Sequence, residues 1–293
     1  MRLILNRIPC AWLLVLSAIQ GVGGAQTDDL MAGTQPSTVK EAEVVAEPQW
    51  TLVPSFSWSF FNKGRDSWQQ ESIELYAHLV EQRLLLDASI DIMDRPPSGE
   101  DITYGMGVTW YANQKIEVHG GVALTPDADF APSERYTLGM SGRVAAPLEL
   151  HLDVERMEFG SFAPAWDHGI TQIRPGLSWW FTDQTRLTLR YTHGWVHDQA
   201  DYDCYSLALQ IGDLPRDARL SIALSYGTDP DLDFGTTGTT LSDAYVVSVF
   251  YHQPVRPDLT LFIGLEYVYR LQPGSGDELY QMWTPTIGLS WKF

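Results

Sequence analysis

Apolar and polar side chains alternate along most of this chain, from about residue 50 to the end. The last eight residues, TIGLSWKF at 286–293, place Ile287, Leu289 and Trp291 on one face and small or polar residues on the other. Residues two apart on a β-strand share a face, so this alternation is typical of a strand with one apolar side. The related sequence GLSWWF at 176–181 repeats the pattern in the middle of the chain.

The alternating segments are separated by turn residues, which predicts a series of strands. We count fourteen, with twelve as the alternative. They are expected at 50–62, 67–80, 83–95, 101–112, 115–126, 134–146, 148–159, 169–181, 185–197, 202–213, 217–228, 241–254, 257–270 and 279–293. An even number returns the end of the chain to the side on which the first strand begins.

Short and long connections alternate between the segments. The long ones include TPDADFAPSE at 125–134 and DPDLDFGTTGTT at 229–240. The tight ones fall at Glu81-Gln82, Asn113-Gln114, Pro147, Thr182-Asp183-Gln184, Leu214-Pro215-Arg216 and Val255-Arg256. A soluble β-sandwich has no reason to gather its long loops at one end, whereas transmembrane barrels have short periplasmic turns and longer outer loops.

The position of the aromatic residues indicates which face meets lipid. On the apolar face, Trp110, Trp179, Phe181, Trp291 and Phe293 lie at the short-turn end, and Trp195, Tyr226, Tyr245, Tyr267 and Tyr269 lie at the long-loop end. Two aromatic girdles around an aliphatic band are typical of the two membrane interfaces. We therefore expect an arginine to be harmful at Leu224 or Ile263 on the apolar face and tolerated at Ser225 or Gly264 on the other face.

These patterns predict an all-β fold, a transmembrane antiparallel β-barrel in the outer membrane of a Gram-negative bacterium. Pairing of the last strand with the first would leave no open edge. A terminal aromatic residue in this pattern resembles the signal that the outer-membrane barrel assembly machinery recognises, which assigns that role to Phe293 and Trp291. The alternative is a soluble β-sandwich that ends in Phe293 by chance.

The first part of the chain has a different pattern. Residues 1–25 have Arg2 and Arg7, an apolar run too short to span a bilayer as a helix, and a small-residue ending, which is the layout of a signal peptide. Residues 26–49 show neither helical nor strand periodicity and are expected to form an acidic periplasmic linker. The barrel domain is predicted at 50–293, with both barrel termini in the periplasm.

Composition excludes several partners and cofactors. The formal net charge of −18 argues against nucleic acid. Beyond the signal peptide only Cys204 remains, so neither an intrachain disulfide nor a cysteine-based metal site can form. We expect no cofactor and no metal site.

The C-terminal third resembles the YaiO family of outer-membrane barrels. The stretches that carry the resemblance are RYTH, DYDCYSLALQIGDLPRDARLSIALSYGT and the ending LSWKF, with a weaker similarity upstream at 125–142. The resemblance implies the fold and the location but no catalytic residue. The family-motif positions are Arg190, Tyr191, Thr192, His193, Gly227 and Thr228.

Charged residues of the polar face are the candidates for a functional lumen. Acidic residues come from the first half of the barrel and basic residues mainly from the second, with Glu266 as the main exception. The lumen-lining candidates are Glu74, Asp87, Asp91, Asp153, Glu266, Arg174, Arg190 and Arg270. Either the two signs face each other across a water-filled pore, as in a porin, or they pair across a narrow lumen and plug it.

Two further groups of residues are candidates for catalysis. His193 is expected on the lipid face near the outer girdle, but neighbouring strands offer no serine for an esterase, so an interfacial anchor fits better. At the outer rim, Asp167, His168, His197, Asp198, Asp201 and Asp203 could form a protease-like or cation-binding group, although loop charges are usually only solvated. We assign no catalytic residue.

The function expected from the sequence is a channel or export conduit for small or elongated polar solutes. The alternatives are an outer-membrane enzyme acting on lipid or surface protein, and a plugged structural or export-accessory barrel. The expected partners are outer-membrane lipid and lipopolysaccharide, the barrel assembly machinery and, for export, a periplasmic partner.

Overall fold

The computed structural model describes residues 49–64, 66–79, 83–96, 99–113, 115–159, 169–196, 201–212, 218–230, 241–272 and 274–293. These residues form fourteen β-strands. The strands are β1 (Gln49–Phe61), β2 (Trp68–Leu79), β3 (Leu84–Arg95), β4 (Gly99–Asn113), β5 (Ile116–Leu124), β6 (Glu134–Ala145), β7 (Leu148–Glu158), β8 (Ile170–Thr182), β9 (Thr185–Val196), β10 (Tyr202–Ile211), β11 (Arg219–Pro230), β12 (Leu241–Arg256), β13 (Leu259–Leu271) and β14 (Glu278–Lys292). No helix in the described ranges is long and apolar enough to cross a membrane.

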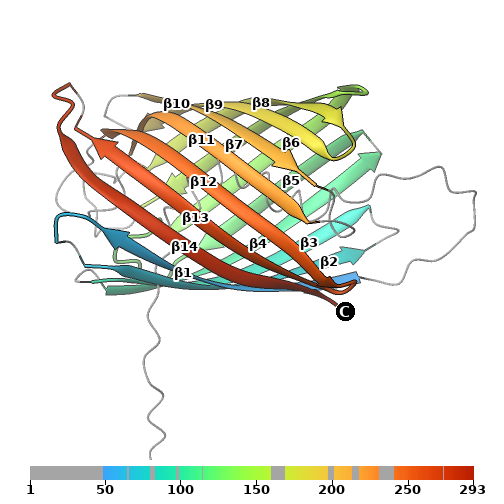
Figure 1. Ribbon diagram of the computed structural model, residues 1–293, viewed down its shortest axis with the longest axis horizontal. Helices are drawn as coiled ribbons and strands as arrows, with labels where there is room; N and C mark the ends of the chain where they lie inside the picture. Colours follow the sequence, from blue (N-terminus) through green and yellow to red (C-terminus); the bar gives the residue numbers. More distant parts are fainter. Residues whose placement is uncertain are drawn as a thin grey trace, which may run out of the picture.

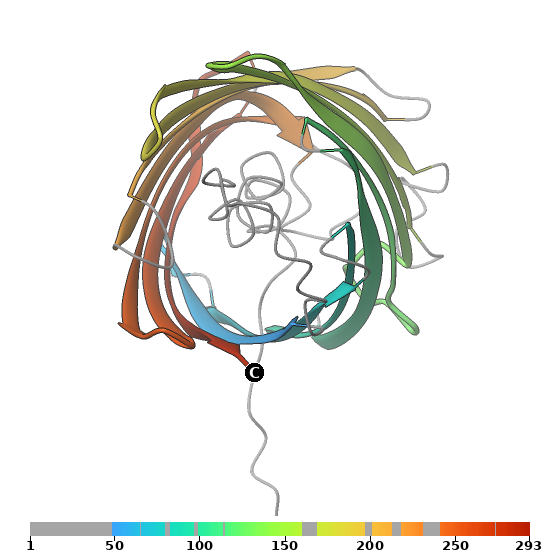
Figure 2. The same cartoon turned by 90° about the vertical axis from the view of Figure 1, so that its right-hand side faces the viewer.

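The strands form one closed antiparallel barrel (Figures 1 and 2). Each strand pairs with its neighbours in sequence, and β1 pairs with β14 to close the ring. At the closing seam, the backbone N–H of Phe293 donates to the Trp50 carbonyl at 3.0 Å and the Trp50 N–H donates to the Phe293 carbonyl at 3.2 Å. The predicted barrel is confirmed, with fourteen strands rather than twelve.

The two rims of the barrel differ in their connections. The rim that carries Gln49 and Phe293, here called the short-turn rim, also has the two-residue turns 146–147, 183–184 and 257–258. Three more connections expected to be tight contain residues outside the described ranges. The opposite, long-loop rim carries the described loop 125–133 between β5 and β6.

Burial alternates along each strand and separates an exterior from an interior face. Leu224 and Ile263 are 46% and 57% exposed on the exterior, whereas the interior-facing Glu266 is only 2% exposed. The aromatic residues expected at the short-turn end, Trp110, Trp179, Phe181, Trp291 and Phe293, are exposed on the exterior, as are Trp195, Tyr226 and Tyr245 toward the long-loop rim. The face assignment of the sequence therefore agrees with the structure on these strands.

Aromatic rings of a neighbouring strand pack over two interior glycines. Phe250 is the cross-strand partner of Gly264, and a Cβ on that glycine would come within 2.3 Å of the Phe250 ring. Phe262 lies in the same way against Gly288, where a Cβ would come within 2.2 Å of the ring. The expectation that an arginine is tolerated at Gly264 is therefore wrong, because the Phe250 ring occupies the space that its side chain would need.

Candidate functional site in the barrel interior

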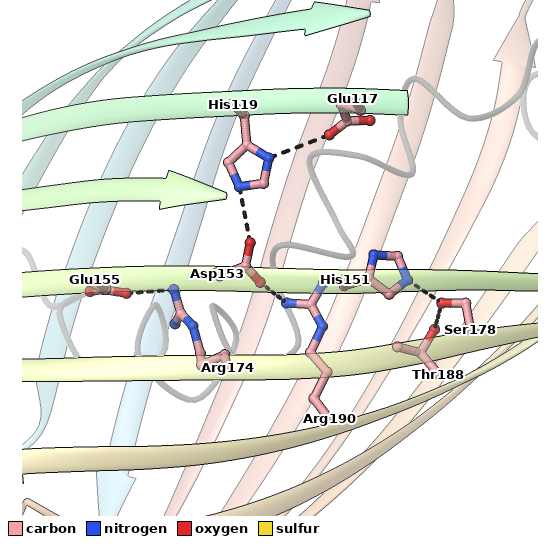
Figure 3. A network of polar contacts seen from close by, with 9 residues as sticks. All are labelled: Glu117, His119, His151, Asp153, Glu155, Arg174, Ser178, Thr188 and Arg190. Carbon is pink, nitrogen blue, oxygen red and sulfur yellow. Dashed lines mark hydrogen bonds and ion pairs between the residues drawn. The ribbon is translucent and has the colours of Figure 1, made fainter. Parts of the chain in front are cut away.

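A network of ion pairs covers the interior side of β7, β8 and β9 (Figure 3). Asp153 and Glu155 point inward from β7 because they are two residues apart. Glu155 Oε2 lies 2.7 Å from Arg174 Nη2 on β8, and Asp153 Oδ2 lies 3.2 Å from Arg190 Nη1 on β9. Arginine and carboxylate thus alternate along one wall.

A glycine extends this network across β6. His119 Nε2 on β5 lies 3.1 Å from Asp153 Oδ1, although β6 runs between the two strands. Gly139 is the β6 residue in the same cross-strand row, and a Cβ there would come within 2.3 Å of both atoms. The missing side chain at Gly139 therefore permits the contact between His119 and Asp153. On its other side, His119 Nδ1 lies 3.5 Å from Glu117 Oε1.

Neutral hydrogen bonds continue the network toward the short-turn rim. His151 Nε2 lies 2.8 Å from Ser178 Oγ, and Ser178 Oγ lies 2.8 Å from Thr188 Oγ1 on β9. All three side chains are on interior positions, and Figure 3 shows them beside Arg190. The site is thus a continuous polar surface that can bind and orient polar groups.

The arrangement corrects the expected separation of charge into an acidic and a basic wall. Asp153 and Glu155 do not face Arg174 and Arg190 across the barrel, because β7, β8 and β9 are hydrogen-bonded neighbours. Sequence position suggested two halves, but the register brings the opposite signs together. Direct pairing on one wall also satisfies charges that would otherwise be costly to bury.

The remaining lumen-lining candidates lie on other parts of the interior. Glu74 on β2 accepts a hydrogen bond from Tyr76, and Asp91 on the adjacent β3 is 7% exposed. Asp87 is also on an interior position of β3, facing Gly107 of β4. Arg270 on β13 donates to Ser242 Oγ at 2.6 Å, and Glu266 lies on the same strand. Asp87 and Asp91 lie within electrostatic range of His119 on β5 and Arg135 on β6, respectively.

One loop folds over the long-loop rim toward the interior. The Asp101 carboxylate, which faces inward from β4, accepts hydrogen bonds from the backbone N–H groups of Asp129, Phe130 and Ala131 at 2.8, 3.1 and 2.8 Å. Phe130 is 5% exposed, and the Arg95 guanidinium lies 4.6 Å from its ring centroid. The loop 125–133 is therefore fixed at the mouth of the barrel by interior side chains.

The exterior motif residues form a separate polar group near the long-loop rim. His193 Nδ1 lies 2.8 Å from Asp203 Oδ1, and the Tyr191 hydroxyl donates to the same oxygen at 2.5 Å. The His193 ring also contacts Trp195 edge-on, with centroids 4.5 Å apart. Aromatic rings and one carboxylate thus surround His193, which is typical of a side chain at the membrane–water interface.

The other family-motif positions are split between the two faces. Arg190, Thr192 and Gly227 are on interior positions, and Thr228 on the exterior donates to Asp243 Oδ1 at 2.7 Å. Of the expected outer-rim group, Asp167, His168, His197 and Asp198 lie outside the described residues. Within the described ranges, no group of three or more His, Cys, Asp or Glu side chains could hold a metal ion.

Three basic side chains of the site were not among the sequence candidates. His119, His151 and Arg135 take part in the network, with Arg135 Nε 3.8 Å from Glu155 Oε1. By the period of two, each lies on the same face of the sheet as an acidic residue of its own or the neighbouring strand. The period of two places all three on the interior face, whereas the division of charge between the two halves of the barrel does not indicate them.

Comparison with known proteins supports the fold but assigns no family. No protein-family model and no curated protein sequence matches this chain. Among solved structures, it is similar to the CymD monoaromatic hydrocarbon channel, with a TM-score of 0.57 and 10% identity over 84% of this chain and 88% of that chain. The resemblance to the YaiO family stays a prediction.

Two further structures show the same likeness. A bacterial polysaccharide outer membrane secretin has a TM-score of 0.57 and 11% identity over 83% of this chain and 98% of that chain. The TodX deltaS2S3 mutant monoaromatic hydrocarbon channel has a TM-score of 0.55 and 9% identity over 84% and 90% of the two chains. The fold of this protein is that of an outer-membrane β-barrel.

Proposed function

We propose that this protein is a channel in the outer membrane of a Gram-negative bacterium that passes small or elongated polar solutes. The observation that carries the proposal is the continuous network of charged and hydroxyl side chains on the interior of β5 to β9. Charged groups in a barrel interior are stabilised by partners and by water, and a water-filled lumen provides both. A barrel that served only as a membrane anchor would not need this surface.

The comparisons support the same role at the level of the fold. Two of the three similar structures are named as hydrocarbon channels and the third as a polysaccharide outer membrane secretin. Fold alone does not determine the solute. The ionic interior of this chain favours a polar solute over a hydrocarbon.

The orientation and the partners follow from the two rims. Short turns face the periplasm in outer-membrane barrels, so we assign the short-turn rim and both barrel termini to that side. Phe293 and Trp291 would then be presented to the barrel assembly machinery, and the long-loop rim to lipopolysaccharide. If the conduit serves export, a periplasmic partner would act at the short-turn rim.

Single-channel recording in planar bilayers tests the proposal. The parent protein should conduct small ions, and the double change Arg174→Ala and Arg190→Ala should shift selectivity toward cations. The reason is that Asp153 and Glu155 would lose the arginines that neutralise them. Arg156→Ala is the matched control, since Arg156 is on the exterior of β7 and pairs with Glu158 at 2.6 Å. A silent parent protein would rule out the open channel and favour the plugged barrel.

The pairing of His193 with Asp203 is the observation that favours an enzyme as the second candidate. A carboxylate on Nδ1 orients an imidazole as a general base, and this pair faces the lipid side of the barrel. Release of fatty acid from phospholipid vesicles by the purified protein, abolished in His193→Ala, would support that function. Equal release by both proteins would reject it.

A further inference from the structure

The interior has a second polar wall, which differs from the ionic network in its chemistry. It consists of β12, β13, β14, β1 and β2, which are neighbours in the ring. Two strands on either side, β3 with β4 and β10 with β11, separate it from β5 to β9. The two walls therefore face each other across the barrel.

Three successive cross-strand rows define this wall, here called the hydroxyl wall. From β12 to β2, the first row contains Ser248, Glu266, Thr284, Ser59 and Trp68, the second Phe250, Gly264, Thr286, Ser57 and Gln70, and the third His252, Phe262, Gly288, Ser55 and Ser72. Only Glu266 and His252 in these rows are ionisable. The wall thus offers hydroxyl, amide and aromatic groups in place of the arginine–carboxylate pairs of the other wall.

Hydroxyl groups form hydrogen-bonded pairs across the closing seam between β1 and β14. Ser57 Oγ lies 2.7 Å from Thr286 Oγ1, and Ser59 Oγ lies 2.8 Å from Thr284 Oγ1. Each hydroxyl can donate one hydrogen bond and accept two. Within a pair one hydroxyl donates to the other, so each pair can still donate and accept further hydrogen bonds.

Aromatic rings lie flat beside these hydroxyl pairs because each ring packs over a glycine, which has no side chain. Phe250 and Phe262 lie against Gly264 and Gly288, so their rings lie along the wall and do not project across the lumen. The His252 ring stacks on Phe262, with centroids 5.4 Å apart and an interplanar angle of 28°. The result is an apolar strip next to a hydroxyl strip.

Two buried polar side chains in the same rows point independently to a ligand. Gln70 is fully buried, and neither its amide nitrogen nor its amide oxygen has a hydrogen-bond partner among the described residues. It faces inward from β2 in the row of Ser57 and Thr286. His252 is 5% exposed, and both of its ring nitrogens likewise lack a hydrogen-bond partner within the described ranges. Buried polar groups in proteins are almost always satisfied, by protein, water or ligand.

We propose that the hydroxyl wall binds a linear saccharide as the solute of the channel. A pyranose ring has an apolar C–H face, which packs on an aromatic ring, and a rim of hydroxyls, which both donate and accept hydrogen bonds. Phe250 and Phe262 supply the first contact, and Ser57, Thr286 and Gln70 supply the second. The inference rests on the proposed channel function and names its substrate class.

Other solute classes fit this wall less well. A phosphate or carboxylate would gain nothing from the hydroxyl pairs beyond what water offers, and the three rows contain no arginine or lysine. A monoaromatic hydrocarbon would leave Ser57, Thr286 and Gln70 without partners, which costs free energy when they are desolvated. A chain of sugars uses both strips at once.

Binding of defined hexasaccharides to the full-length protein tests the inference. The probes are the linear hexamers of α-1,4-linked glucose, β-1,4-linked glucose and β-1,4-linked N-acetylglucosamine. Binding is measured by titration calorimetry in detergent, and block of the ion current is measured in planar bilayers. At least one hexamer should bind and reduce the current, and Phe262→Ala and Gln70→Ala should each weaken binding about five- to tenfold.

Matched controls come from the exterior positions. Gln69→Ala and Phe60→Ala change the same residue types on the lipid-facing side of β2 and β1, and each should leave binding within about twofold. Phe262→Leu removes the aromatic face while nearly keeping the volume, so its affinity loss cannot be assigned to a collapsed wall. Heat-modifiable migration verifies that each variant is folded.

The outcomes separate this inference from the proposed function. A conducting protein that binds none of the hexamers at concentrations up to about 10 mM overturns the saccharide wall and leaves the channel standing. Equal weakening by interior and exterior variants also overturns it. A silent protein that still binds a hexamer through Gln70 and Phe262 supports the wall but rejects the open channel.

Discussion

At the scale of single residues, interior glycines decide where neighbouring side chains can lie. Gly139 has no side chain to separate His119 from Asp153. Gly264 and Gly288 are each covered by a phenylalanine ring. A strand glycine usually weakens a sheet because it packs no side chain and loses more entropy on folding. Here the aromatic ring of the next strand covers the glycine backbone and offsets part of that loss.

Gly264→Arg should destabilise the barrel by about 1 to 3 kcal/mol, because the new side chain must displace the Phe250 ring. Ser225→Arg, also on an interior position, is the control and should have a smaller effect. The measurement is the free energy of unfolding in guanidinium with the protein folded into lipid vesicles. Combining Gly264→Arg with Phe250→Ala should recover part of the loss, and no recovery would contradict the steric explanation.

The exterior face gives a second expectation at the residue scale. Leu224→Arg places a charge on the apolar exterior, where Leu224 is 46% exposed, and should cost roughly 2 to 4 kcal/mol if the site lies near the bilayer midplane. The same vesicle assay compares it with Ser225→Arg on the adjacent interior position. A larger loss for Ser225→Arg would mean that the two faces are assigned the wrong way round.

At the scale of elements, the loop 125–133 depends on one interior carboxylate. Asp101→Ala removes the acceptor of three backbone N–H groups and should raise the amide exchange rates of residues 129–131 about tenfold or more. Asp94→Ala, on the exterior position of the adjacent β3, should leave these rates unchanged. Hydrogen exchange followed by mass spectrometry makes the comparison, and unchanged rates in Asp101→Ala would show that the loop is held in another way.

The last strand gives the second expectation for an element. Deleting Phe293 removes an exterior aromatic residue and both backbone hydrogen bonds to Trp50 at the closing seam. Lys292→Ala keeps the seam and changes only an interior side chain. The yield of folded barrel in outer-membrane fractions should therefore fall far more for the deletion. Similar yields would argue against a role of Phe293 in assembly.

At the scale of the whole molecule, closure of the ring determines how the barrel unfolds. Since β1 pairs with β14, the fourteen strands leave no open edge from which unfolding can begin. Unboiled protein in detergent should therefore migrate faster on gels than boiled protein. Recovery in the soluble periplasmic fraction, or identical migration of the two samples, would contradict a membrane barrel.

Closure also gives the interior its two facing walls. The ionic wall on β5 to β9 and the hydroxyl wall on β12 to β2 arise because strands distant in sequence close into one ring. A polar solute would meet arginine–carboxylate pairs on one side and mainly hydroxyl and aromatic groups on the other. This combination is the basis of the proposed channel and of its saccharide substrate.

The sequence by itself determined the architecture of the barrel. The period of two assigns each side chain to the exterior or the interior, and it placed Leu224 and Ile263 outside and Asp153 and Arg174 inside. Alternating short and long connections, with an even strand count, predicted a barrel with both ends at one rim. These features are local, because they depend only on strand geometry and on the residues of each turn.

Only the tertiary structure decided which interior side chains meet. Pairing of β7 with β8 places Glu155 beside Arg174, and the absence of a side chain at Gly139 lets His119 reach Asp153. The seam between β1 and β14 brings Ser57 to Thr286, although 229 residues separate them in sequence. Contacts of this kind depend on strand register and ring closure, and the alternation of a single strand contains neither.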